Sequence, residues 1–128
     1  MVVRALTIIV LVAMWSGCSR PAAAPKDRAV VSGKVTFSGQ PLPAGTITFK
    51  STTGAISTST SINSGGFYST DRAPLGKNLV MIDTSSIQYG NPAAYVPIPA
   101  KYGDASASRL SVEVQAGTND NVDFALEK

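Results

Sequence analysis

Short runs of alternating apolar and polar residues recur along the chain from residue 29 onward. A period of two places successive side chains on opposite faces of a strand, so each run predicts a β-strand with one buried face. The predicted strands cover 31–37, 46–50, 56–62, 67–70, 79–82, 110–115 and 122–126. No segment has the period of a convincing amphipathic helix. Seven short strands in about 100 residues predict an all-β, two-layer sandwich.

The alternation also predicts which side chains form the core. They occupy every second position of a strand and are apolar or β-branched, which suits a pleated, half-buried surface. The predicted inward set contains Val31, Val35, Phe37, Ile47, Phe49, Ile56, Thr58, Thr60, Ile62, Leu110, Val112, Val114, Val122, Phe124 and Leu126. Asn63-Ser64-Gly65-Gly66 predicts a hairpin turn between two of the strands.

The strand at 79–82 departs from this pattern because it is apolar on both faces. Leu79 and Met81 occupy positions where polar, outward-facing residues are common. Two interpretations are open. A loop or a neighbouring strand covers Leu79 and Met81, or the two side chains form an exposed surface that binds a partner.

A long segment without periodicity, residues 85–107, precedes the last two predicted strands. It contains three prolines and the tyrosines Tyr89, Tyr95 and Tyr102. Loops of this length in small domains are usually functional or mobile. The tyrosines therefore stack on a sugar or anchor a protein partner, or they pack back over the sheet and cover its apolar strand.

The first eighteen residues have a different pattern. Arg4 precedes an apolar run from Ala5 to Trp15, which is interrupted only by Thr7. A helix of that length spans about 16 Å, whereas the hydrocarbon core of a bilayer is about 30 Å thick. The run is too short for a stable transmembrane helix, and it predicts the charged and apolar regions of a secretory signal.

The apolar run ends in Ser16-Gly17-Cys18, which contains the only cysteine of the chain. This segment resembles the lipobox of bacterial lipoproteins, in which the peptide is cut before the cysteine and the thiol is acylated. The resemblance implies that Cys18 is the lipidated first residue of the mature chain and that the lipid bilayer is a partner. At least two acyl chains give stable anchoring. The alternatives are a signal peptide cleaved elsewhere and a buried free cysteine.

The segment after the cysteine predicts how the chain is divided. Residues 19–28 contain two prolines, small residues and charges without an apolar period, which predicts a flexible tether. The predicted organisation is a signal peptide at 1–17, a lipidated cysteine with its tether at 18–28, and a folded domain at 29–128. In some bacteria an aspartate at the position of Ser19 is the inner-membrane signal. Its absence favours the outer membrane of a bacterial cell envelope.

The composition narrows the chemistry open to the domain. The chain has no histidine and one cysteine, which excludes a histidine base, a histidine metal ligand and an internal disulfide. The net charge is +3 and the basic residues are scattered, so we expect no nucleic-acid binding. The aspartates lack the spacing of a calcium loop. We therefore expect no catalytic residue, no metal site and no cofactor.

The region 29–128 resembles the carboxypeptidase regulatory-like domains. The segments that carry the likeness are Val31-Ser32-Gly33-Lys34-Val35-Thr36-Phe37, Gly39-Gln40-Pro41-Leu42, Ser64-Gly65-Gly66-Phe67-Tyr68 and Pro74-Leu75-Gly76-Lys77. Ile98-Pro99-Ala100-Lys101-Tyr102-Gly103-Asp104, followed by Ser108-Arg109-Leu110, is similar to a segment of small lipoproteins of planctomycete-type bacteria. The resemblance implies a seven-stranded Greek-key β-sandwich of the transthyretin-like type. This chain has Asn78 where the family usually carries an aromatic residue.

Because a fold does not carry an activity with it, the resemblance implies no enzyme. We expect a membrane-anchored, non-catalytic lipoprotein whose β-sandwich serves envelope structure or protein interaction. The candidate partner surface contains Leu79, Met81, Tyr89, Tyr95 and Tyr102. The alternative is a module that binds a carbohydrate or another small ligand through loop 85–107, so the candidate partners are an envelope protein and a glycan.

Overall fold

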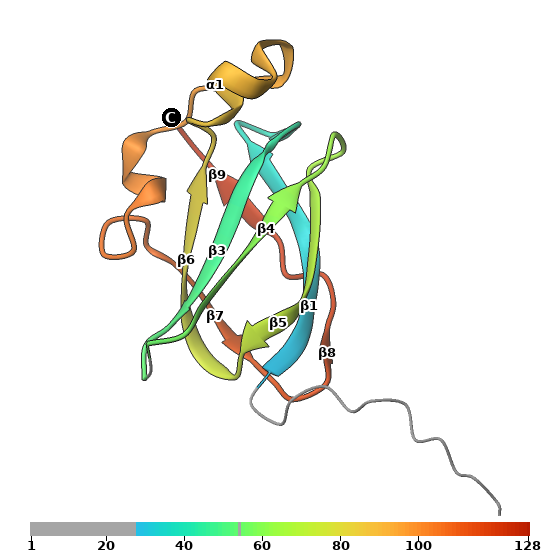
Figure 1. Ribbon diagram of the computed structural model, residues 1–128, viewed down its shortest axis with the longest axis vertical. Helices are drawn as coiled ribbons and strands as arrows, with labels where there is room; N and C mark the ends of the chain where they lie inside the picture. Colours follow the sequence, from blue (N-terminus) through green and yellow to red (C-terminus); the bar gives the residue numbers. More distant parts are fainter. Residues whose placement is uncertain (1–27, 54) are drawn as a thin grey trace, which may run out of the picture.

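The computed structural model of the chain describes residues 28–53 and 55–128. Most of these residues belong to strands, which form two sheets packed face to face (Figure 1). The prediction of an all-β fold built from two layers is confirmed. The predicted signal peptide, Cys18 and all of the tether except Arg28 lie outside the described residues.

The first sheet is built around β1 (Arg28–Phe37), which pairs with every other strand of the sheet. Its antiparallel partners are β2 (Gln40–Pro41) and β5 (Phe67–Pro74). Its parallel partners are β8 (Thr118–Asn119) and β9 (Phe124–Leu126). The C-terminal segment therefore runs along β1 in the same direction, and the two ends of the domain stabilise each other.

The second sheet has the order β4-β3-β6-β7 and is antiparallel throughout. Its strands are β3 (Gly45–Ser51), β4 (Ser57–Ile62), β6 (Gly76–Asp83) and β7 (Leu110–Val114). β7 pairs with β6 only from Gly76 to Val80, so the last part of β6 extends beyond its partner.

The core lies between the two sheets and follows the predicted alternation. Its most deeply buried apolar residues are Val31, Val35, Leu42, Ile47, Phe49, Val80, Ile82 and Leu126. Tyr68 stands at the centre of an aromatic row, with ring centroids 5.8 Å from Phe49 and 6.3 Å from Phe124. Burial of such rings contributes strongly to the stability of a small domain.

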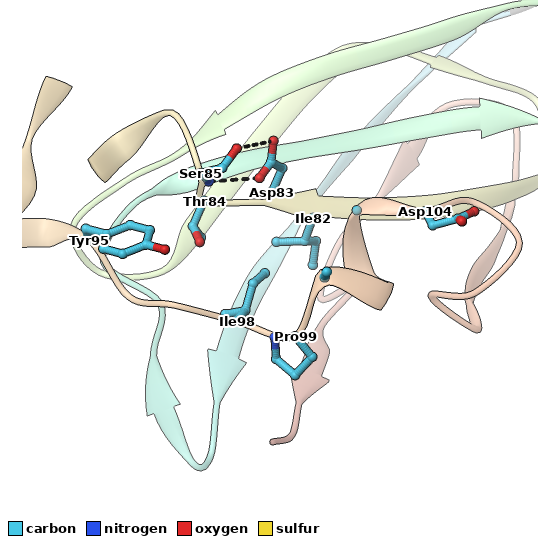
Figure 2. A pocket seen from close by; sticks show the side chains of 10 residues that line it. Ile82, Asp83, Thr84, Ser85, Tyr95, Ile98, Pro99 and Asp104 are labelled. Atoms are coloured by element: carbon cyan, nitrogen blue, oxygen red, sulfur yellow. Dashed lines mark hydrogen bonds between the residues drawn. The ribbon is translucent and has the colours of Figure 1, made fainter. Parts of the chain in front are cut away.

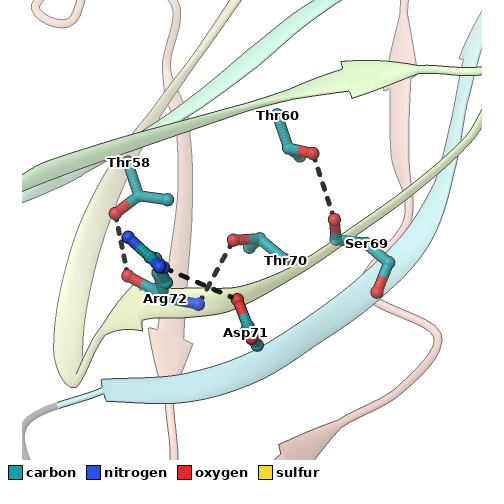
Figure 3. Close-up of polar contacts among 6 residues, drawn as sticks. All are labelled: Thr58, Thr60, Ser69, Thr70, Asp71 and Arg72. Carbon is teal, nitrogen blue, oxygen red and sulfur yellow. Dashed lines mark hydrogen bonds and ion pairs between the residues drawn. The ribbon is translucent and has the colours of Figure 1, made fainter. Parts of the chain in front are cut away.

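Threonine hydroxyls join the two sheets where the edge strands β4 and β5 meet. Thr58 Oγ1 donates a hydrogen bond to the carbonyl oxygen of Arg72 at 2.8 Å (Figure 3). Thr60 Oγ1 donates to the carbonyl oxygen of Ser69 at 3.1 Å. The alternation predicts that Thr58 and Thr60 face inward, and these contacts confirm it. Ile56 of the same predicted face is 36% exposed and precedes β4.

Two glycines allow backbone segments to approach closely. A Cβ atom on Gly33 would lie 1.9 Å from the carbonyl oxygen of Val122, which crosses β1 at that point. Gly66 has a φ angle of +83° and lies against the Val35 carbonyl, where a Cβ atom would be 2.7 Å from the oxygen. Both positions require glycine, the first for space and the second also for its left-handed backbone.

The strand directions give the sandwich two ends. One end, which we call the proximal end, contains Arg28 at the start of β1 and the turns at Leu75 and Gly117. The other, distal end contains the hairpin turn 63–66 and helix α1 (Ile87–Gly90), and the C-terminus lies near it (Figure 1). β1 begins one residue before the predicted domain boundary.

Residues 28–53 and 55–128 contain nine strand segments where the pattern predicts seven. The additional segments, β2 and β8, have two residues each and are too short to show an alternation. Three short helical turns, α1, η1 (Pro92–Ala94) and η2 (Ala100–Gly103), lie within loop 85–107. None of the helices in the described part of the chain is long and apolar enough to cross a membrane.

Candidate functional site

Loop 85–107 packs along the part of β6 that extends beyond β7. Just before it, Thr84 Oγ1 donates to the carbonyl oxygen of Val96 at 2.8 Å. Just after it, the buried Ser108 Oγ donates to the carbonyl oxygen of Val80 at 2.7 Å. Val96 and Ile98 are half-buried against the core. The loop therefore covers an edge of the sandwich.

Tyr102 is part of the interior and not of an exposed surface. Its side chain is 6% exposed, and its hydroxyl group bonds to the backbone of Glu127. Of the two interpretations of the loop tyrosines, Tyr102 follows the second, because η2 turns its ring toward the core, between loop 85–107 and the C-terminal segment. A residue in a loop without periodicity gives no sequence signal for its direction.

The other two tyrosines of the loop differ in their exposure and in their position. Tyr89, in α1 at the distal end, is 86% exposed. Tyr95 is half-buried and lines a pocket beside β6. Loop 85–107 therefore provides one fully presented tyrosine and one that borders a concave site, instead of a cluster of three.

Leu79 and Met81 are half-buried on the outer face of the second sheet. The strand register places Leu79 between Lys50 and Ser111. Met81 lies beside Thr48, whose hydroxyl is 2.7 Å from the Ser59 hydroxyl. Each apolar side chain thus has polar neighbours across the sheet, and the apolar surface there is small.

A pocket of about 380 Å³ lies between the end of β6 and loop 85–107 (Figure 2). The side chains that shape it include Asp83, Ser85, Tyr95, Ile98, Pro99 and Asp104. Asp83 accepts hydrogen bonds from the Ser85 backbone N–H at 2.8 Å and the Ser85 hydroxyl at 3.0 Å. These bonds fix the Asp83 carboxylate on the outer face of β6, on the opposite side of the strand from Ile98 and the half-buried Tyr95 ring (Figure 2).

Asp104 borders the pocket at the end opposite Tyr95 (Figure 2). It accepts hydrogen bonds from the Ser106 hydroxyl at 2.8 Å and the Ser106 backbone N–H at 2.9 Å. The hydroxyl bond and then the backbone bond lower the pKa of the Asp104 carboxyl, because both favour its charged form. Ionised carboxylates accept hydrogen bonds from hydroxyl or amine groups. Among residues 28–53 and 55–128 no three potential ligand side chains group around a metal position.

A shallower concavity of about 670 Å³ lies on the other side of η2 and includes Lys101 and Arg109. The Lys101 ammonium group is 5.1 Å from the centroid of the Tyr102 ring, and the side chain is exposed. Lys101 therefore lacks the burial beside a serine that a lysine base requires.

A third concave site surrounds Phe67, which was not among the predicted site residues. The ring of Phe67 is 54% exposed, and the Lys34 ammonium group lies 5.3 Å from its centroid. Phe67 and Tyr68 are adjacent on one strand, so their rings must point to opposite faces. The adjacent aromatic residues in the sequence already indicated an exposed ring, because burial of Tyr68 places Phe67 on the solvent-facing side of the strand.

Tyr68 connects β5 to the segment before β9 on the buried side of this region. Its hydroxyl group donates to the carbonyl oxygen of Val122. Burial, and then the negative charge of Asp123, raise the pKa of the Tyr68 hydroxyl far above its ordinary value. The group therefore stays protonated and continues to donate throughout the physiological pH range.

No family model matches the chain, and no curated protein is similar to it.

Proposed function

We propose that this protein is a lipid-anchored, non-catalytic lipoprotein of a bacterial cell envelope, held in the outer membrane by acylated Cys18. The observation that carries the proposal is the Ser16-Gly17-Cys18 segment, which follows a short apolar run and precedes the first strand by ten residues. Acyl chains on one cysteine anchor a domain without a spanning helix. The absence of histidine from the chain supports a role without catalysis.

The finer fold belongs to the same proposal. We assign the domain to a Greek-key, transthyretin-like sandwich of the carboxypeptidase regulatory-like kind, whose seven strands are the nine segments without the two-residue β2 and β8. The order of the motifs supports this assignment, as does the role of Leu42, which follows the short Gly39-Gln40-Pro41 turn and is fully buried. The Gly65-Gly66 step before Phe67 supports it further, because Gly66 adopts a left-handed backbone.

The anchor would hold the domain by its proximal end. The tether of residues 19–28 reaches at most about 35 Å and joins the proximal end at Arg28. Tyr89 lies at the distal end and is 86% exposed. The tether is attached at the opposite end, so it leaves Tyr89 and α1 accessible to a partner in the envelope. We propose the distal end, with Leu79 and Met81 on the side of the sheet, as the surface for an envelope protein.

The test of this function compares the full chain with its Cys18→Ala variant. We expect wild type in the membrane fraction and Cys18→Ala in the soluble periplasmic fraction. Ser19→Ala is the matched control and should remain with the membrane. A photo-crosslinking residue in place of Tyr89 should then capture one specific protein from intact cells, whereas the same probe in place of Gln115 should not.

A second candidate function is the binding of a small ligand or sugar in the pocket beside β6. The lining of this pocket favours it, because the Tyr95 ring borders one end and Asp104, whose carboxylate is fixed by Ser106, borders the other (Figure 2). Pockets of a few hundred Å³ with a few convergent polar groups are typical ligand sites. A glycan panel tests it, because Tyr95→Ala should abolish any binding that this pocket provides.

A further inference from the structure

We propose that the outer face of the first sheet carries a separate sugar-binding site centred on Phe67. The Phe67 pocket, as we call it, has a volume of about 510 Å³ and includes Ser32, Lys34, Phe67, Asp120, Asn121 and Asp123. These residues come from β1, β5 and the connection between β8 and β9. Segments far apart in the sequence therefore meet at this one surface.

The ring of Phe67, at the centre of the pocket, is exposed to solvent although it carries no polar group. Phe67 is 54% exposed, whereas its neighbour Tyr68 is 3% exposed. A single exposed apolar side chain is ordinary on a protein surface. The ring is distinguished by the polar groups around it, several of which are held in place by hydrogen bonds.

Two carboxylates are fixed beside the ring through one oxygen each. Asp120 Oδ1 accepts a hydrogen bond from Ser32 Oγ at 3.1 Å. Asp123 Oδ1 accepts a hydrogen bond from the Lys34 backbone N–H at 2.8 Å. In both cases the bond uses Oδ1, so Oδ2 remains available to accept a hydrogen bond from a ligand. Since the donors belong to β1, both side chains are oriented by the sheet before any ligand arrives.

Donor groups complete the site. The Lys34 ammonium group, 5.3 Å from the ring centroid, has three N–H donors. Asn121 lies between the two aspartates and has a φ angle of +58°, a backbone conformation that asparagine tolerates better than most residues. Its amide group can both donate and accept.

The combination selects the class of ligand. A pyranose ring has an apolar face of C–H groups, which suits an aromatic ring, and a rim of hydroxyl groups, which suits carboxylates, an amide and an ammonium group. A phosphate-bearing ligand would be repelled by Asp120 and Asp123. A cationic peptide side chain would compete with Lys34 for the face of Phe67. A neutral oligosaccharide therefore fits best.

The location suits a ligand in the envelope. Lys34 lies six residues along β1 from Arg28, which places the Phe67 pocket about 20 Å from the proximal end, toward the distal end. The pocket is formed by the first sheet and the connection between β8 and β9, whereas loop 85–107 packs along β6 of the second sheet, so the two pockets share no residue. The inference does not depend on the anchor, because the Cys18→Ala chain has the same surface.

The experiment is a calorimetric titration of the full chain, purified in mild detergent, with cellotetraose and with the β-1,4-linked tetrasaccharide of N-acetylglucosamine. We expect at least one of them to bind wild type and Cys18→Ala equally. Phe67→Ala should raise Kd about tenfold or more, which corresponds to about 1.4 kcal/mol. Phe67→Tyr, which keeps the ring, should stay within about threefold of wild type. Ser69→Ala, on the same strand and outside the pocket, is the matched control.

Three results would overturn the proposal. The first is that neither tetrasaccharide binds. The second is that Phe67→Ala binds like wild type; if Tyr95→Ala then loses binding, the site is the pocket beside β6. The third is that a lysine-rich peptide binds through Phe67 while both sugars fail, which would assign the surface to a protein. Equal thermal unfolding of all variants ensures that they are compared in the folded state.

Discussion

The Tyr102 hydroxyl group makes two hydrogen bonds to one residue, Glu127. It donates to the Glu127 carbonyl oxygen at 3.2 Å and accepts from the Glu127 N–H at 3.0 Å. The pair joins η2 to the segment that follows β9, and β9 in turn pairs with β1. Tyr102 therefore connects loop 85–107 to the C-terminal end of the first sheet.

Removal of this hydroxyl group should loosen the C-terminal segment. We expect Tyr102→Phe to lower the free energy of unfolding by about 1 kcal/mol, because the two hydrogen bonds to the backbone of the solvent-exposed Glu127 are lost. Tyr102→Ala should cost about 3 kcal/mol, because a buried aromatic ring is removed as well. Urea denaturation measures both. Amide exchange at Glu127 should be faster in Tyr102→Phe, and unchanged exchange there would contradict the proposed connection.

Gly33 should be intolerant of any side chain. A Cβ atom there would lie 1.9 Å from the Val122 carbonyl oxygen, and the Val122 N–H donates to the Ser32 carbonyl oxygen at 2.9 Å. Gly33→Ala must therefore displace the crossing segment, at a cost of about 2 kcal/mol or more. Gly90→Ala is the matched control, because its Cβ atom meets nothing within 4 Å. Equal midpoints of thermal unfolding for the two variants would refute this account.

Asn78 is a buried polar residue that the turn between β5 and β6 depends on. It is 0% exposed, and its Nδ2 donates to the carbonyl oxygens of Pro74 at 2.7 Å and Gly76 at 3.1 Å. Its Oδ1 has no hydrogen-bond partner within the described residues. Asn78→Ala should cost about 2 kcal/mol, since two carbonyl groups lose their donor.

The charged variant at this position should be worse. Asn78→Asp places a carboxylate against the two carbonyl oxygens, so we expect a larger loss of stability than in Asn78→Ala. Chemical denaturation of both variants, with the exposed Gln88→Ala as control, measures the difference. Asn78→Asp as stable as wild type would show that the amide donor is not needed.

Asp104 should show a pH dependence set by Ser106. The Ser106 hydroxyl and backbone N–H lower the pKa of the Asp104 carboxyl, so Ser106→Ala should raise that pKa toward its ordinary value. Because the folded-state pKa is lowered, the stabilising contribution is present above the unfolded-state pKa and is lost as the pH falls through the folded-state pKa. An NMR titration of the Asp104 carboxyl group measures this, with Ser111→Ala as control. An unchanged pKa in Ser106→Ala would contradict the assigned cause.

The strands and most of the core could be predicted from the sequence because their side chains have a period of two. Val31, Val35, Ile47 and Phe49 are buried as the alternation predicts. The same reasoning gives the inward direction of Thr58 and Thr60. Such positions are determined locally, since a strand that buries one face must alternate.

Features that depend on contacts between distant segments could not be predicted in this way. The parallel pairing of β8 and β9 with β1 joins residues about 90 positions apart, and two- and three-residue strands have no measurable period. Tyr102 faces inward because of its contact with Glu127, which no local pattern contains. Phe67 was predictable in principle, since one of two adjacent aromatic residues on a strand must face outward.

The central claim, anchoring through Cys18, is tested most directly by mass spectrometry of the N-terminal peptide of the protein purified from membranes, after growth with labelled fatty acid. The account predicts a mature chain that begins at Cys18, carries labelled acyl chains, and loses the label in Cys18→Ala. A mature chain that begins elsewhere, or an unmodified Cys18 thiol in protein that still sediments with membranes, would contradict it.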